Sequence, residues 1–320
     1  MNYPWWMWAS FGISVLVLMV LDLGVLNKKD HKIGVKESLK LSAFYISAGL
    51  LFGGWVWYAL GPKAGMDYFT GFLVEKSLSM DNVFVMSLVF TYFAVPAKFQ
   101  HRVLLWGILG AIVMRGIMIG LGAALIHQFS WILYIFGAFL VFTGIKMLWA
   151  NDEEETDISK NPLINWLKGH FRFTEKIENH DFFVKAPDPK GTGKSVWWAT
   201  PLFLTLIMVE ISDVIFAVDS VPAIFAITTD TFIVFTSNIF AILGLRALYF
   251  ALAAMVHRFE YLKYSLAVVL VFIGAKILLV NFDIKIPSPI SLGVTFGLLV
   301  IGVLYSLWKT RNDPKQLMAE

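Results

Sequence analysis

The stretch Glu75-Lys-Ser-Leu-Ser-Met-Asp81-Asn82 places two carboxylates inside an apolar segment of this 320-residue chain. A second stretch, Glu210-Ile-Ser-Asp213 followed by Asp219-Ser220, does the same further along the sequence. An ionised carboxylate at the centre of a bilayer costs about 2.5–3.5 kcal/mol on insertion scales. Five such groups in two equivalent places are too costly to be incidental. They predict a polar site inside a membrane, built by duplication.

The composition indicates an integral membrane protein. Hydrophobic residues make up 58% of the chain and charged residues only 15%, whereas a soluble domain is about 25% charged. The chain has no cysteine, which excludes disulfides and thiolate metal ligands. Any metal that this chain binds must therefore have oxygen or imidazole ligands.

Nine segments are long enough to cross a bilayer, which takes about 20 apolar residues per helix. The first lacks a basic leading region and contains Asp22, so it does not resemble a cleaved signal peptide. The expected fold is all-α, a polytopic membrane protein. The segments lie near 5–26, 38–60, 68–94, 102–127, 131–150, 199–223, 231–256, 261–281 and 289–309.

The loops predict the orientation of the chain. Lysine and arginine concentrate in loops 27–37, 95–102 and 257–263 and in the C-terminal tail, and the alternate loops hold few of them. By the positive-inside rule, the basic loops face the cytoplasm. We therefore expect the N-terminus outside and the C-terminus in the cytoplasm.

The two acidic stretches align with each other. Asp81-Asn82-Val83 matches Asp219-Ser220-Val221, and Glu75 and Asp213 each stand six residues earlier. A second alignment pairs Glu75 with Glu210 instead. Both alignments keep the two later aspartates together, so both indicate an internal repeat.

Basic residues follow each acidic stretch in the same order. Arg115 and Arg246 lie in the middle of the next apolar segment of each half, and Lys146 and Lys276 lie in matching Val-Phe-x-Gly-x-Lys-x-Leu motifs. Each repeat has three spans, so the second enters the membrane from the opposite side. Inverted repeats of this kind are common in secondary transporters, which bind substrate near the midplane.

This repeat divides the chain into five parts. Two N-terminal helices (1–67) precede the first three-helix repeat (68–150), a cytoplasmic loop (151–198), the second repeat (199–281), and a last helix with a cytoplasmic tail (282–320). Residues 161–171 of the loop favour a surface-lying helix, and 186–194 favour a linker. The acidic run 152–155 with His170 or His180 leaves a regulatory metal sensor as an alternative.

A straight helix would separate the acids of each stretch. Residues six apart lie about 120° apart around a helix, so Glu75 and Asp81 would not share a face. We therefore expect a break between them, and a second break near Pro222. Such breaks would bring the carboxylates together.

The ligand chemistry favours a hard divalent cation. Carboxylate, amide and hydroxyl oxygens suit Mn²⁺, Mg²⁺ or Ca²⁺ better than Cu⁺ or Zn²⁺. Asp22 is either a lining residue or a solvated helix-end charge. Alternatively, the acids only pair with basic residues to hold helices together. The predicted metal ligands are Glu75, Asp81, Asn82, Glu210, Asp213, Asp219 and Ser220, and the charge-compensating residues are Arg115, Lys146, Arg246 and Lys276.

No enzyme motif accompanies these residues. The chain has no His-Glu-x-x-His, no Gly-x-Ser-x-Gly and no Walker A loop. We therefore expect no catalysis, no resident cofactor and no nucleic-acid partner, and an ion gradient as the driving force. The expected partners are the divalent metal and the lipid bilayer, and the sequence identifies no protein partner.

The two acidic stretches resemble the signatures of the TerC family of bacterial inner-membrane proteins, most closely its Alx branch. The resemblance extends from Asp22 to the last span, without departure at the acidic positions. It implies manganese efflux, and labels of tellurium resistance and redox modulation are also attached to relatives. A membrane scaffold or redox-modulator component of a metal or tellurite stress complex, without transport, is the competing interpretation.

Overall fold

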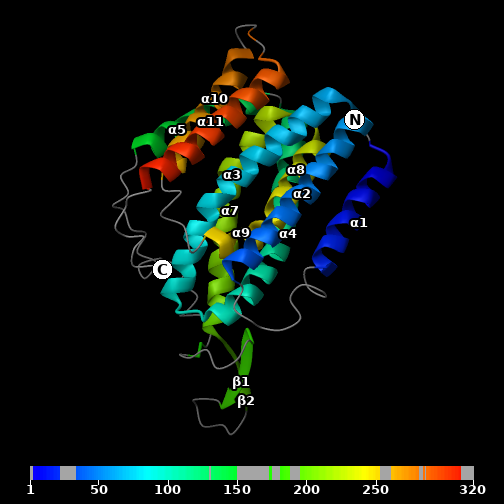
Figure 1. The fold of residues 1–320 in the computed structure, drawn as a ribbon. Coiled ribbons are helices and arrows are strands. Elements are labelled where there is room, and N and C mark those ends of the chain that lie inside the picture. Colours follow the sequence, from blue (N-terminus) through cyan, green and yellow to red (C-terminus); the bar gives the residue numbers. More distant parts are fainter. Residues whose placement is uncertain are drawn as a thin grey trace.

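The chain folds as a bundle of apolar helices with a small hairpin at one end (Figure 1). The computed structural model describes residues 3–21, 34–129, 131–149, 173–174, 181–187, 195–252, 261–280, 284 and 286–310, without the side chains of Val35, Asp81, Phe84, Ala186 and Pro187. The helices are α1 (Trp5–Leu21), α2 (Val35–Leu60), α3 (Pro62–Tyr92), α4 (Ala97–Gln128), α5 (Ile132–Trp149), α7 (Pro201–Ile227), α8 (Thr231–Leu243), α9 (Leu245–Leu252), α10 (Leu262–Leu279) and α11 (Ser288–Lys309).

Each predicted span overlaps one of these helices, with α8 and α9 sharing the segment 231–256. Among the described residues, α2, α4, α5, α7, α10 and α11 are long and apolar enough to cross a membrane. The bent pair α8–α9 would make a seventh span, α1 has only 17 residues, and α3 carries several charges. The polytopic helical fold is confirmed, but the count of nine spans is not.

The two predicted repeats correspond to α3–α4–α5 and α7–α8/α9–α10. The helix pairing has the symmetry that a repeat requires, because α4 packs on α7 as α8 packs on α3. The third helices, α5 and α10, pack on each other. In Figure 1, α7 rises from the hairpin end of the bundle whereas α3 runs down toward it. The repeats therefore run in opposite directions.

The predicted helix breaks between Glu75 and Asp81 and near Pro222 are wrong. Helix α3 is continuous from Pro62 to Tyr92, and α7 continues through Pro222 to Ile227. Proline is tolerated in membrane helices because neighbouring groups satisfy the freed backbone. The described break lies instead at Gly244, where α8 and α9 meet at a bend of 40°.

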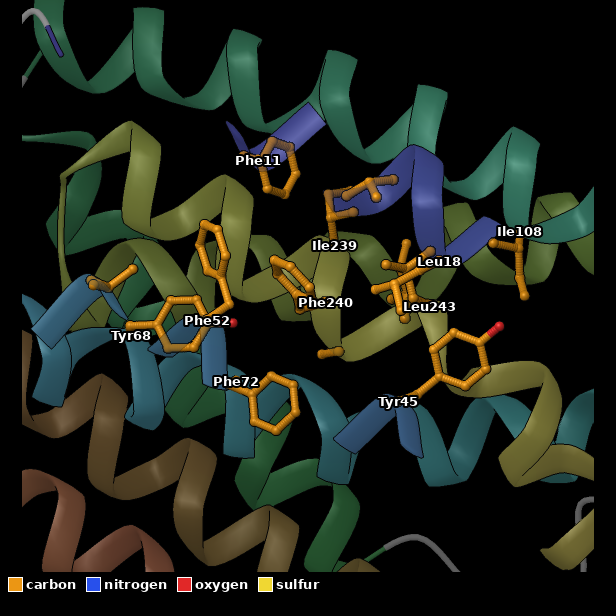
Figure 2. Close-up of a cluster of buried hydrophobic side chains, with 14 of the residues drawn as sticks. Phe11, Leu18, Tyr45, Phe52, Tyr68, Phe72, Ile108, Ile239, Phe240 and Leu243 are labelled. Carbon is orange, nitrogen blue, oxygen red and sulfur yellow. The ribbon is translucent and has the colours of Figure 1, made fainter. Parts of the chain in front are cut away.

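Aromatic packing holds α8 against α2 and α3. Figure 2 shows this cluster, in which the Phe52 and Phe240 rings are 4.5 Å apart and Tyr68 lies beside them. Phe11 of α1 contacts Phe240 at 5.9 Å. Edge-to-face and tilted pairs at these separations are each worth about 0.5–1.5 kcal/mol beyond area burial. The cluster therefore fixes the position of α8 in the bundle.

The start of α8 is tied to the N-terminal segment. Asp230 caps the helix by accepting hydrogen bonds from the backbone N–H groups of Phe232 and Ile233 at 3.0 and 3.4 Å. The hydroxyl of Tyr3 donates to the same carboxylate. Burial and the Asp230 carboxylate raise the pKa of Tyr3 above its usual value, so the hydroxyl keeps the proton that it donates.

The hairpin replaces part of the predicted linker. Strand β1 (Phe183–Pro187) pairs antiparallel with β2 (Ser195–Ala199), and Lys185 faces Trp197. The interpretation of 186–194 as a linker was therefore wrong at its start, because Ala186 and Pro187 belong to β1. The predicted surface helix 161–171, the acidic run 152–155, His170 and His180 lie outside the described residues.

Candidate functional site

Arg115 lies at the centre of a buried ion-pair cluster. Its side chain comes from the middle of α4 and is 0% exposed. Nε donates to Asp213 Oδ2 at 3.1 Å, and Nη2 donates to Asp213 Oδ1 at 2.9 Å. Nη1 donates to Glu75 Oε1. One guanidinium therefore joins the acidic stretches of both repeats.

Uncharged polar groups complete the cluster. Nη1 of Arg115 also lies 3.3 Å from Ser220 Oγ and 3.2 Å from Asn238 Oδ1. Asn238 donates through Nδ2 to Glu75 Oε2 at 3.0 Å. Glu75, Arg115 and Asp213 lie near the middle of α3, α4 and α7, and Asn238 lies near the middle of the bent α8–α9 pair. The cluster therefore lies at the depth that the midplane of a bilayer would have.

The cluster is too well satisfied to be a chance contact. Charge-assisted hydrogen bonds of this kind are about twice as strong as neutral ones, and each acid is less than 4% exposed. Removing one partner of such a buried pair costs about 3–5 kcal/mol, because the other charge is then left uncompensated. The alternative that the acids and basic residues hold helices together therefore applies to Glu75, Arg115 and Asp213.

A cavity of about 190 Å³ adjoins the cluster. Asp219 reaches it from α7 and accepts a hydrogen bond at 3.4 Å from Thr143 of α5. Asn82 is 2% exposed, and its Oδ1 has no hydrogen-bond partner among the described residues, although its Nδ2 donates to Asp213 at 3.3 Å. The lining residues are Glu75, Leu78, Asn82, Arg115, Thr143, Met147, Phe216, Asp219, Ser220 and Leu270.

A second cavity is much smaller, at about 10 Å³, and shares no lining residue with the first. Asp213 and Arg246 provide its charged lining, beside apolar side chains such as Ile242. This volume suits at most one water molecule. Because Arg115 faces the large cavity and its partner Asp213 faces the small one, this ion pair stands between them.

The other predicted site residues lie in different places. Glu210 is half-buried against Gly110 of α4 and does not line the cavities described here. Lys146 is exposed in the last turn of α5, and Lys276 donates to Ser291 of α11 at 3.3 Å. Asp22 lies outside the described residues, and Asp81 is placed on α3 by its backbone alone. Convergence of Asp81 with Glu75 therefore stays a prediction.

Sequence reasoning missed three polar residues of this region. Asn238 completes the cluster, Thr143 contacts Asp219, and Lys76 donates to the Ala241 carbonyl of α8 at 3.0 Å. Asn238 is an isolated amide within the apolar segment 231–256, and Lys76 directly follows Glu75. A polar side chain within an apolar segment was the signal that could have identified Asn238 and Lys76.

Within the described part of the chain, no group of three or more histidine, aspartate or glutamate side chains is arranged to hold a metal ion. In the buried cluster, the guanidinium of Arg115 lies between Glu75 and Asp213, in the place where a bridging metal ion would bind. Asn82 and Asp219 instead line the cavity next to it.

Residues 60–314 match the family described as "Integral membrane protein TerC family". The chain belongs to the TerC family. Among relatives, "Putative membrane-bound redox modulator Alx" of Escherichia coli strain K12 is 49% identical over 97% of both chains, and the protein of the same name from Salmonella typhi is 48% identical over 98% of both. "Uncharacterized membrane protein STKORF319" of Myxococcus xanthus is 45% identical over 96% of this chain and 94% of that one. No solved structure matches. The TerC match covers both three-helix repeats.

Proposed function

We propose that this TerC protein is a secondary transporter that exports divalent metal cations, with no enzymatic activity of its own. The supporting observation is buried Asn82, whose Oδ1 has no partner among the described residues and which lines a cavity together with Asp219 and Ser220. A buried carbonyl oxygen without a donor is destabilising by about 1–3 kcal/mol. A cation entering the cavity would satisfy it, and carboxylate, amide and hydroxyl oxygens are ligands of hard cations.

Mn²⁺ is the proposed cargo. The oxygen ligands suit Mn²⁺, Mg²⁺ and Ca²⁺ alike, and the choice among them rests on the resemblance to manganese exporters. Asp81 is the further acid that we expect at this site, because it matches Asp219 in the repeat. The site lies in the bacterial inner membrane, with the N-terminus outside and the C-terminus in the cytoplasm.

Arg115 acts as a tethered cation in this proposal. With the metal absent, its guanidinium compensates Glu75 and Asp213. A cation in the adjoining cavity competes for Glu75, which faces both the cluster and the cavity. Two neighbouring cations repel each other strongly at low dielectric, so metal binding displaces the guanidinium from Glu75. That exchange couples occupancy of the cavity to the packing of α3 against α4.

Export needs a driving ion. Moving a divalent cation out against an inside-negative potential costs about 2.3 kcal/mol per charge per 100 mV, and the chain has no ATP-binding motif. Protons are the proposed counter-ion, since carboxylates must lose their protons to bind metal. Inward protons would release the cation from the carboxylates outside.

Flux through purified protein tests the proposal. Liposomes that contain the protein and a metal-sensitive dye should show Mn²⁺ flux that Asp219→Asn and Asp81→Asn each abolish. Asp181→Asn is the matched control, because this aspartate lies outside the helices and forms a surface ion pair with Arg102 at 3.9 Å. Absence of divalent-cation flux from folded wild-type protein would exclude the transporter.

A membrane scaffold or redox component is the second candidate, favoured by the names of the Alx relatives. The absence of cysteine from the chain would oblige such a component to act through a cofactor or another protein. This candidate predicts no flux in the liposome experiment, together with capture of a metal- or tellurite-stress protein in the membrane. The two candidates therefore give opposite results in one measurement.

A further inference from the structure

The break between α8 and α9 is held by a lysine from another helix. A helix end leaves carbonyl groups without intrahelical donors, and the Ala241 carbonyl lies just before this break. Lys76 of α3 is buried, and its Nζ donates to that carbonyl at 3.0 Å. A buried amine at a helix break satisfies two groups that would otherwise be costly to bury.

The backbone at the break is shaped around this amine. A Cβ on Gly244 would lie 2.9 Å from Lys76 Nζ and 2.9 Å from the Cβ of Tyr45 on α2. Glu75, which precedes the lysine, binds Asn238, three residues before Ala241. Helix α3 therefore holds α8 at two successive points that both precede Gly244.

The segment beyond the break carries an arginine to the site. Helix α9 begins at Leu245, and Arg246 is 2% exposed beside Asp213 in the small cavity. We propose that Lys76 is a positioning residue, whose Nζ fixes the break at Gly244 and so holds Arg246 against the lining of the small cavity. Loss of this contact lets α9 move and opens the cavity to water.

The absence of cysteine allows a direct test. Ala111→Cys places a thiol in the lining of the small cavity, and Ala223→Cys places one at a buried position of α7 outside both cavities described here. The rate of modification by a water-soluble thiol reagent then reports opening at each position in the full-length protein in vesicles. The Ala223→Cys reporter detects general loosening of the bundle.

Lys76→Met and Gly244→Ala should each raise modification at Ala111→Cys about tenfold, as expected for loss of a hydrogen bond from a charged donor. The two substitutions together should give no more than one of them, and Lys76→Arg should give less than Lys76→Met. Gly71→Ala is the matched control, because its Cβ would lie 3.0 Å from Ser237 in the same α3–α8 interface, away from the break. It should leave the rate unchanged.

Three results would overturn the positioning role: an unchanged rate at Ala111→Cys, an equal rise at Ala223→Cys, or effects of Lys76→Met and Gly244→Ala that multiply. The consequence of this positioning role for transport rests on the proposed function, whereas the expected labelling rates do not. If labelling responds as expected in vesicles without Mn²⁺ flux, the positioning role stands and the exporter is excluded. If the vesicles show Mn²⁺ flux but the labelling rate does not respond, the exporter stands and the positioning role is excluded.

Discussion

Gly144 of α5 and Gly274 of α10 make the same contact in opposite directions. A Cβ on Gly144 would lie 2.6 Å from the Ala267 carbonyl oxygen, and one on Gly274 would lie 2.5 Å from the Gly137 carbonyl oxygen. Positions 137 and 267, like positions 144 and 274, are 130 residues apart. The contact is therefore symmetric between the repeats, and glycine allows the two backbones to approach as small residues do at membrane helix interfaces.

This symmetry predicts matched losses of stability. Gly144→Ala and Gly274→Ala should each lower the free energy of unfolding by about 1–3 kcal/mol, the usual cost of overpacking. Thermal unfolding in detergent measures the effect. Gly297→Ala on α11 is the control, because a Cβ there meets no atom within 4 Å. Equal free energies of unfolding for all three variants would show that the backbones of α5 and α10 do not approach each other at these glycines.

Arg115 should be essential for stability as well as for function. Arg115→Met leaves Glu75 and Asp213 buried without their cation, and should cost about 3–5 kcal/mol. Adding Asp213→Asn removes one of the two negative charges, so the double variant should be more stable than Arg115→Met alone. Denaturation of the purified variants measures both effects.

A surface pair provides the comparison for Arg115. Arg102→Met breaks the ion pair with Asp181, whose side chain is 49% exposed, and should change stability by about 0–1 kcal/mol. If Arg115→Met were no more harmful than Arg102→Met, the acids would not depend on the guanidinium. A double variant less stable than Arg115→Met would indicate that Asp213 has other essential contacts.

The order of charged residues in the sequence identified the charged centre of the site, but not the uncharged residues and the helix break around it. Glu75, Asp213 and Arg115 were predictable because charges inside apolar segments are costly and recur in both halves. Asn238 has no counterpart in the repeat, so pattern matching could not select it. The break at Gly244 was missed because a glycine within an apolar segment resembles a packing residue. Only the position of the Lys76 amine shows why the helix bends there.

The orientation is testable by reporter fusions. Fusions after Lys160 and after Lys315 should both report the cytoplasm, and a fusion at Thr229 should report the outside. Three spans lie between the start of the first repeat and the start of the second, so the two repeats enter the membrane from opposite sides. The basic loops are retained in the cytoplasm. A reporter moved to Lys98, in the basic first turn of α4, is the internal control and should agree with Lys160. The same side for Lys160 and Thr229 would refute the inverted repeat.

Metal binding should weaken as the pH falls. Protons and the cation compete for the oxygens of Asp219 and Glu75. For each proton that binding releases, the metal affinity should fall about tenfold for every unit by which the pH drops, in the range where the carboxylate titrates. Calorimetry in buffers of different ionisation enthalpy counts the released protons. Asp219→Asn should reduce that number, and Asp181→Asn should leave it unchanged.

The same competition determines how flux responds to a gradient. An inward proton gradient should accelerate Mn²⁺ efflux from loaded vesicles, and a protonophore should remove the acceleration, because protonated carboxylates release the metal. The membrane potential is clamped with potassium and valinomycin, so that only the pH difference drives exchange. Flux that follows the metal's own gradient and ignores pH would make this protein a passive pathway.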